Sequence, residues 1–133
     1  MIVADTNTLA YLYLTGEHTP AAERVFRKDP IWAAPLLWRS EFRNVLAHYI
    51  RRGLLTLSEA QQIMDAATQD LQGREFDVPS APILRLVAES SCSAYDCEFV
   101  ALAQDLGVRL VTSDRRIRSQ FPDTTVSLES FGA

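Results

Sequence analysis

Short apolar runs alternate with helix-length amphipathic segments along the whole chain, and this alternation constrains the fold more than any other feature. The runs of strand length are residues 2–4, 31–34, 74–78, 108–112 and 125–128. The segments between them space their apolar residues three or four apart, as helices do. Strands that alternate with helices are typical of α/β folds with a mainly parallel sheet. We therefore expect an α/β protein.

The expected helices span residues 6–14, 21–28, 36–52, 58–71, 82–90, 93–106 and 114–120. Ser58 and Ser93 stand where N-caps are favoured, and Gly53 and Gly107 stand where helices commonly end. The chain has 133 residues, of which 47% are hydrophobic. A chain of this size forms one domain with its own core. We predict a single domain over residues 1–133.

The sequence contains no membrane span, no basic leader and no zinc-binding cysteine pattern, and these features bear on the location of the protein and on the state of its thiols. No apolar run approaches the length needed to cross a bilayer, and the first residues contain no basic leader. We therefore expect a cytoplasmic protein that does not contact a membrane. Cys92 and Cys97 lack the spacing of a zinc site, so we expect both thiols to be reduced and packed.

Two aspartates stand directly after apolar strands. Asp5 follows residues 2–4, and Asp114 follows residues 109–113. In open α/β sheets, ligands bind outside the carboxyl ends of the strands. Each residue is also a favourable N-cap for the helix that follows it. Neither aspartate alone decides between binding and capping.

A glutamate interrupts the apolar face of the long helix over residues 36–52. The apolar stripe that surrounds Glu41 consists of Leu37, Trp38, Phe42, Val45, Leu46 and Tyr49. An ionised carboxylate is costly on such a face unless it has a partner. Arg39 and Arg43 are the nearest candidates for a buried ion pair, but both fall off the stripe. A role in a pocket is the alternative.

Asp96 lies on the apolar side of its helix in the same way, because Phe99, Val100 and Ala103 follow it at helical spacing. Glu98 and Asp105 fall on the other side, where we expect them to be solvated. The structural alternative for Asp96 is a capping box with Ser93, in which Asp replaces the preferred Glu.

The four carboxylates converge at one end of the sheet if the strands are parallel. Carboxylates in one small pocket repel each other, so either some take up protons or a cation neutralises them. Oxygen ligands without His or Cys favour Mg²⁺ or Mn²⁺ over zinc. Such an ion polarises phosphoryl oxygens and activates water.

Four segments of the chain, in this order and at this spacing, resemble the PIN-domain nucleases and in particular the VapC-like toxins of prokaryotic toxin–antitoxin pairs. They are Val3–Asn7, Ser40–Leu46, Ala94–Ala103 and Leu110–Asp114. Each segment is a weak signal alone, whereas all four together are specific. The resemblance covers essentially the whole chain.

The resemblance implies a three-layer α/β/α sandwich around a parallel sheet of about five strands. It also implies a Mg²⁺- or Mn²⁺-dependent endoribonuclease with Asp5, Glu41, Asp96 and Asp114 as the catalytic, metal-binding residues. Asn7 and Thr112 would orient these carboxylates. Hydrolysis by an activated water would leave a 5′-phosphate.

RNA and protein partners follow from the same resemblance. A cognate antitoxin and a homodimer are typical of the family. The net charge of −4 argues against RNA binding by charge alone. The candidate phosphate contacts are Arg39, Arg43, Arg115, Arg116 and Arg118, and a solvated helix face is the alternative for each.

Two rival functions remain to be weighed. One is a catalytically silent PIN-fold module that binds RNA or protein, which intact acidic positions argue against. The other is a phosphatase of the haloacid-dehalogenase type or a receiver-like domain. The phosphatase needs Asp where this chain has Asn7, and both need a lysine after a later strand. Lys28, the only lysine, stands in an early helix.

Overall fold

The sheet consists of five strands that all run parallel, in the order β3-β2-β1-β4-β5. The computed structural model describes all 133 residues. The strands are β1 (Ile2–Ala4), β2 (Trp32–Pro35), β3 (Glu75–Phe76), β4 (Leu110–Val111) and β5 (Thr125–Val126). Every residue of β1, β2 and β4 is buried, as expected where helices cover both faces of a parallel sheet.

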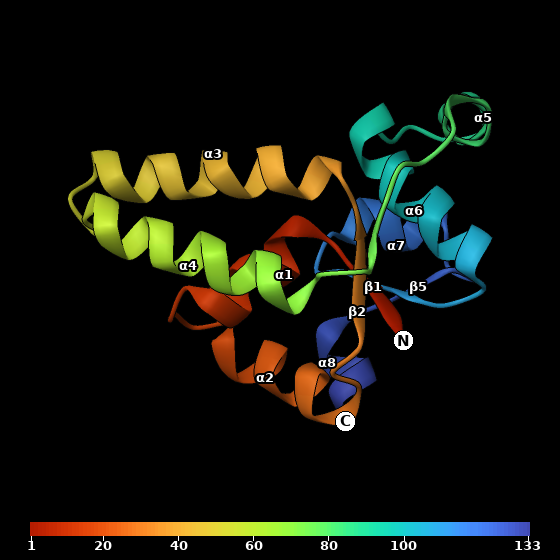
Figure 1. Ribbon diagram of the computed structural model, residues 1–133. Coiled ribbons are helices and arrows are strands. Elements are labelled where there is room, and N and C mark those ends of the chain that lie inside the picture. The colour runs from red at the N-terminus through yellow and green to blue at the C-terminus, as the bar shows by residue number, and fades with distance from the viewer.

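Eight helices form the two outer layers. They are α1 (Thr6–Tyr13), α2 (Thr19–Lys28), α3 (Leu37–Arg51), α4 (Leu57–Asp70), α5 (Ser80–Ala88), α6 (Ala94–Leu106), α7 (Arg115–Gln120) and α8 (Leu128–Gly132). In Figure 1, α1 to α4 lie on one side of the sheet and α5 to α7 on the other. Right-handed crossovers require this, because the chain crosses the sheet in one direction up to β3 and in the opposite direction afterwards. The three-layer α/β/α expectation is confirmed.

The strand order reverses at β1, which lies between β2 and β4. The chain after β1 turns towards one edge of the sheet, whereas the chain after β4 turns towards the other. Such a switch point leaves a crevice at the carboxyl ends of the two strands, and ligands of open α/β sheets bind there. The residues that follow β1 and β4 therefore lie where a ligand of this fold is expected to bind.

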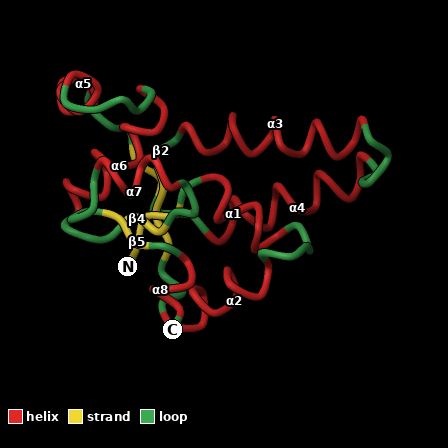
Figure 2. The backbone as a smooth tube through the Cα atoms, turned by 180° about the vertical axis from the view of Figure 1, so that it is seen from behind, coloured by secondary structure: helices red, strands yellow, loops and turns green.

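Helices α3 and α4 form an antiparallel hairpin that extends well beyond the sheet, as Figures 1 and 2 show from opposite sides. Near the sheet, α3 buries Trp38, Phe42 and Leu46 against the core. At the far end Gly53 adopts a φ of 72°, which allows the tight turn into α4. Leu54 and Leu57 lie at this tip with 62% and 64% of their surface exposed.

Two details differ from the sequence-based expectation. Helix α4 is capped by Thr56 rather than Ser58, because Thr56 and Glu59 form a reciprocal capping box. The last strand ends at Val126, and Ser127 caps the short helix α8 instead. Helix α8 packs against α2. No helix combines the length and the apolar composition that crossing a bilayer requires.

The C-cap of α6 provides a test of the fold. Gly107 has a φ of 66°, in the left-handed region, whereas Gly16 has no positive φ and room for a methyl group. Gly107→Ala should lower the free energy of unfolding by about 1 kcal/mol. Gly16→Ala should leave it unchanged or raise it slightly, because alanine restricts the unfolded chain. Urea denaturation measures both, and equal losses would contradict this assignment of the caps.

Candidate functional site

One pocket at the carboxyl ends of β1 and β4 contains all four carboxylates that the sequence singles out. Its volume is about 250 Å³. The residues that line it are Asp5, Thr6, Asn7, Glu41, Asn44, Val45, Asp96, Phe99, Asp114 and Ile117. They come from the ends of two strands and from α1, α3, α6 and α7. Residues up to 112 positions apart in the chain, Asp5 and Ile117, therefore share one small space.

Asp5 is the most buried carboxylate of the pocket, with 9% of its surface exposed. Its Oδ1 caps α1 by accepting hydrogen bonds from the backbone N–H of Thr8 at 2.9 Å and from the Thr8 hydroxyl at 2.7 Å. Its Oδ2 accepts a hydrogen bond from the hydroxyl of Thr112. Each carboxylate oxygen has about two acceptor sites. One site on Oδ2 is therefore left for a ligand.

The partner of Asp5 is set by the register of the sheet. Ala4 pairs with Val111 across β1 and β4, so the next residues on the two strands, Asp5 and Thr112, stand side by side. Thr112 also accepts a hydrogen bond from the backbone N–H of Asp114 at 3.0 Å. The expected role of Thr112 in orienting a carboxylate thus has a direct geometric basis.

Asp114 caps α7 through Oδ1, which accepts a hydrogen bond from the backbone N–H of Ile117 at 3.0 Å. No group of the protein binds its Oδ2. Capping and pocket-lining are therefore compatible for both aspartates, since each turns one oxygen to its helix. The alternatives that the sequence left open are not exclusive.

Glu41 lies half-buried in the pocket and forms no ion pair with a cationic side chain. Its Oε1 accepts a hydrogen bond from the hydroxyl of Thr6 at 2.7 Å. Arg39 instead forms an ion pair with Glu75, and the Arg43 guanidinium donates to the carbonyl of Arg39 at 3.0 Å. The buried ion pair considered for Glu41 is thus absent.

Asp96 has a free side chain. The Ser93 hydroxyl accepts a hydrogen bond from the backbone N–H of Asp96 at 3.1 Å, but the Asp96 carboxylate makes no reciprocal bond. The box is therefore incomplete, in contrast to the complete box of Thr56 and Glu59 at α4. The Asp96 carboxylate faces the pocket instead of its own helix end.

The charges of the pocket are not compensated by the protein. None of the ion pairs in the structure includes Asp5, Glu41, Asp96 or Asp114. Burial raises the pKa of Asp5 above its usual value, against hydrogen bonds from Thr112 and Thr8, and repulsion from Asp114 adds to the rise. Burial also raises the pKa of Glu41, against the Thr6 hydrogen bond, and Asp96 and Asp5 raise it further.

The acidic region extends beyond the four predicted residues. Glu98, which we expected to be solvated, is half-buried. Burial raises its pKa, and repulsion from Glu41 and Asp77 contributes to the rise. Two positions correspond to about 200° around a helix, so the pattern placed Glu98 opposite Asp96. Its partial burial comes from neighbouring elements that the pattern of one helix does not show.

Three polar residues of the site, Thr6, Thr8 and Asn44, were not predicted from the sequence. Thr6 and Thr8 hold Glu41 and Asp5, and the only signal for them was their position in the first turn after Asp5. Asn44 lines the pocket one helical turn after Glu41. Asn7 also lines the pocket but makes no side-chain hydrogen bond, so its orienting role stays a prediction.

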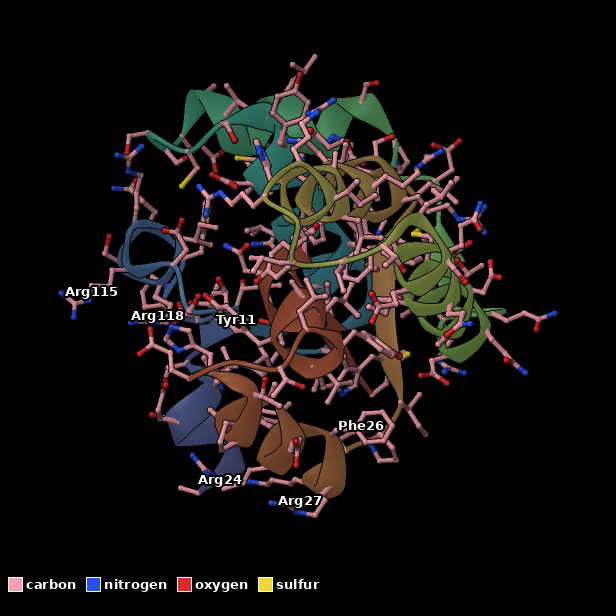
Figure 3. All side chains as sticks on the ribbon, turned by 90° about the vertical axis from the view of Figure 1, so that its left-hand side faces the viewer. Tyr11, Arg24, Phe26, Arg27, Arg115 and Arg118 are labelled. Carbon is pink, nitrogen blue, oxygen red and sulfur yellow. The ribbon has the colours of Figure 1, made fainter.

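The arginines divide into two groups. Arg39 and Arg43 do not line the carboxylate pocket, and Arg39 forms an ion pair with Glu75. We therefore do not propose them as phosphate contacts of this pocket. Arg115 and Arg116, which directly follow Asp114, are exposed and form no ion pair. Figure 3 shows Arg115 projecting outwards from α7. Arg118 donates to the carbonyl of Thr112 at 3.0 Å and so supports the loop before Asp114.

A divalent cation fits the donors of this pocket. They are carboxylate and amide oxygens, which Mg²⁺ and Mn²⁺ prefer. No three acidic, His or Cys side chains converge closely enough to bind one ion together. An ion here would therefore take one or two carboxylate oxygens directly and complete its shell with water, as Mg²⁺ usually does.

Comparisons with known proteins agree with this architecture. The family model described as PIN domain matches residues 2–120. Ribonuclease VapC3 of Pyrobaculum aerophilum is 29% identical over 125 residues, which cover 91% of this chain and 95% of that protein.

Solved structures show the same fold. A crystal structure of a Pyrobaculum aerophilum protein has a TM-score of 0.77 at 19% identity and covers 98% of this chain and 92% of its own. A toxin–antitoxin complex from Klebsiella pneumoniae has a TM-score of 0.72 at 17% identity, with 96% and 98% covered. The FitAcB structure from Neisseria gonorrhoeae has a TM-score of 0.73 at 15% identity, also with 96% and 98% covered.

The hydrogen bond from Thr112 to Asp5 can be tested by its effect on stability. Thr112→Val leaves the buried Oδ2 of Asp5 without its donor and the backbone N–H of Asp114 without its acceptor, and should cost about 1–3 kcal/mol. Thr125→Val is a matched control, because the buried Thr125 hydroxyl donates to the neutral carbonyl of Phe121. Its loss should be smaller, about 1 kcal/mol. Equal losses in urea denaturation would show that Asp5 does not depend on Thr112.

The raised pKa of Glu41 predicts a pH-dependent stability difference in metal-free protein. A carboxyl whose pKa is raised on folding loses its stabilising contribution as pH rises from the unfolded value of 4.5 through the folded one. Glu41→Gln should therefore gain stability relative to wild type as pH rises. Chelator-treated protein, melted in urea from acid to neutral pH, provides the measurement.

Glu75→Gln supplies a control of opposite sign. Despite partial burial, hydrogen bonds from Arg39 and Trp38 and the charge of Arg39 lower the pKa of Glu75. Its stabilising contribution is present above the unfolded pKa and is lost as pH falls through the folded one. This variant should lose stability relative to wild type at neutral pH. The same sign for both variants would refute the assigned electrostatics.

Proposed function

The chain belongs to the PIN-domain family, and we propose that residues 1–133 act as one nuclease domain, a metal-dependent endoribonuclease and the toxin of a toxin–antitoxin pair. The observation that carries the proposal is the set of four carboxylates in one pocket without a protein cation. The likeness to a ribonuclease over most of both chains supports RNA as the substrate.

Mg²⁺, or Mn²⁺ in its place, would be held by Asp5 and Asp96, with Glu41 and Asp114 as further ligands through water. Asp5 offers the remaining acceptor site of Oδ2, and Asp96 offers both oxygens. The ion supplies polarisation of the phosphoryl oxygen and activation of water. One ion or two would suit this donor set.

The residues of the chain position the reacting groups. Glu41 has one oxygen fixed by Thr6, so its other oxygen is aimed and free to accept a hydrogen bond from the attacking water. Asp114 can orient the same water through Oδ2. Water attacks phosphorus while the bond from phosphorus to the 3′ oxygen breaks, which leaves a 5′-phosphate and a 3′-hydroxyl.

An antitoxin and a second copy of the chain are the proposed protein partners. The neighbours in fold include a toxin–antitoxin complex. The tip of the α3–α4 hairpin exposes Ile50, Leu54 and Leu57, and such clustered apolar surface is characteristic of protein contacts. Leu57→Asp should weaken a partner that covers this tip without affecting the carboxylate pocket.

Metal-dependent RNA cleavage is the direct test of the proposed function. Purified wild type should cut a mixed pool of structured RNAs at discrete sites with Mg²⁺ or Mn²⁺ and not with chelator. Asp96→Asn should reduce the rate by about 100-fold or more, since loss even of groups that only support metal ligands costs 10–100-fold. Its side chain makes no hydrogen bond in the protein, so the fold should be unaffected.

Asp105→Asn is the matched control, because Asp105 is exposed on the same helix and does not line the carboxylate pocket. It should cleave like wild type. Products that end in a 2′,3′-cyclic phosphate would refute attack by water. A folded wild type that cleaves nothing, with or without metal, would favour the alternative of a catalytically silent binding module.

Arg115 and Arg116 are the proposed phosphate contacts beside Asp114. Replacement of either by alanine should weaken RNA binding and reduce the slope of log K against log salt concentration by about 1. Arg27→Ala, on α2, should leave the slope unchanged, because Arg27 already pairs with Glu23. Binding isotherms at several salt concentrations measure the slope, and unchanged slopes for both α7 variants would remove them from the site.

A further inference from the structure

A groove made of three adjoining hollows leads away from the carboxylate pocket along α1 and α3. A hollow of about 300 Å³ shares Asn7 and Val45 with that pocket. A third hollow, of about 340 Å³, shares Val45 and Tyr49 with the second and reaches Arg52 at the end of α3. The three spaces therefore adjoin one another.

Two aromatic rings form a platform in the middle hollow. Tyr11 of α1 and His18, just before α2, have ring centroids 4.5 Å apart and planes inclined by 34°. This separation is within the range of interacting aromatic pairs. The His18 side chain is 48% exposed, and its Nε2 lies 3.4 Å from Oε1 of Glu17. That contact is made at the edge of the ring, so it does not cover the ring face. We call Tyr11 and His18 the aromatic platform.

The platform is fixed before any ligand arrives. The Thr19 hydroxyl donates to the carbonyl of Tyr11 at 2.7 Å and accepts from the backbone N–H of Gly16 at 3.0 Å, so the turn that carries His18 is tied to α1. The hydroxyls of Tyr11 and Ser113 share a hydrogen bond of 3.3 Å. In Figure 3, Tyr11 and Arg118 lie at about the same height, in keeping with the contact of Tyr11 to Ser113 just before α7. Rigid groups lose little entropy on binding.

The chemistry of the groove matches unpaired RNA. Exposed aromatic rings stack on nucleobases of any sequence, and single-stranded RNA presents unstacked bases to such rings. The groove continues to Arg52, an exposed arginine without an ion-pair partner, which suits a phosphate. A duplex keeps its bases paired and stacked internally, so it cannot use the platform.

We propose that an RNA base next to the cleaved bond stacks on the aromatic platform of Tyr11 and His18. This inference rests on the proposed nuclease function of the neighbouring carboxylates. The chain then follows the groove along α3, and its backbone approaches Arg52. His18 and Tyr11 bind substrate and do not take part in the chemical step.

RNA binding by variants tests the platform. All proteins carry Asp96→Asn so that the RNA stays intact, and Mg²⁺ is present. The probe is a fluorescein-labelled, unstructured oligonucleotide of about 12 nucleotides, which spans a typical single-strand site. His18→Ala should weaken binding about 5- to 150-fold, the range expected for loss of one stacked base. His18→Phe should bind like the parent, because it keeps the ring.

Two further readouts separate stacking from a structural role. A 2-aminopurine base in the probe should lose fluorescence on binding to the parent and to His18→Phe, but not to His18→Ala. A duplex of the same sequence should bind more weakly than the single strand.

The outcomes distinguish this inference from the function on which it rests. If wild type cleaves RNA and His18→Ala binds as tightly as its parent, the platform is wrong and the nuclease stands. Equal binding of duplex and single strand would also overturn the platform. If wild type does not cleave but His18→Ala still weakens binding, the nuclease is wrong and the stacking site stands.

Discussion

The hydrogen bond between Thr112 and Asp5 joins the ends of the two central strands, and the positions of two of the four pocket carboxylates depend on it. It exists because β1 and β4 pair in parallel with Ala4 opposite Val111, which places the next residues side by side. Asp5 then caps α1, and Thr112 holds the backbone of Asp114 at the start of α7. Two helices and two carboxylates are thus fixed by one register. The reversal of strand order at β1 leaves the space in front of them open.

The fold holds carboxylates close together in the pocket although their charges repel each other. Asp5 and Glu41 are buried or half-buried, no protein cation neutralises them, and both have a raised pKa. Natural proteins rarely bury unpaired charges unless a ligand compensates for them. The metal ion proposed for the pocket would compensate for these charges, and it would link the stability of the pocket to the proposed hydrolysis. The exposed arginines of α7 lie just outside the acidic space, where they can contact phosphates without cancelling its charge.

The sequence predicted those features that follow from periodicity along one segment. Strands followed by Asp predicted the positions of Asp5 and Asp114, and a carboxylate on an apolar stripe predicted the inward direction of Glu41. Features that depend on contacts between distant segments were not predictable in this way. Arg39 falls off the apolar stripe of α3, and its ion-pair partner is Glu75 of β3. The sheet brings these two residues together, which the sequence pattern of α3 alone cannot show. The aromatic platform likewise needs the turn between α1 and α2, whose shape is set by Thr19.

Calorimetric titration of metal-free protein with Mn²⁺ tests the central claim most directly, because it asks whether the four carboxylates act as one cation site without reference to RNA. Wild type should bind Mn²⁺ with a defined stoichiometry, and the affinity should fall as pH is lowered, because a protonated carboxyl does not bind the metal. Asp96→Asn should bind at least about tenfold more weakly, whereas Asp105→Asn should bind like wild type. Equal Mn²⁺ binding by wild type and Asp96→Asn, or none by folded wild type, would contradict the account.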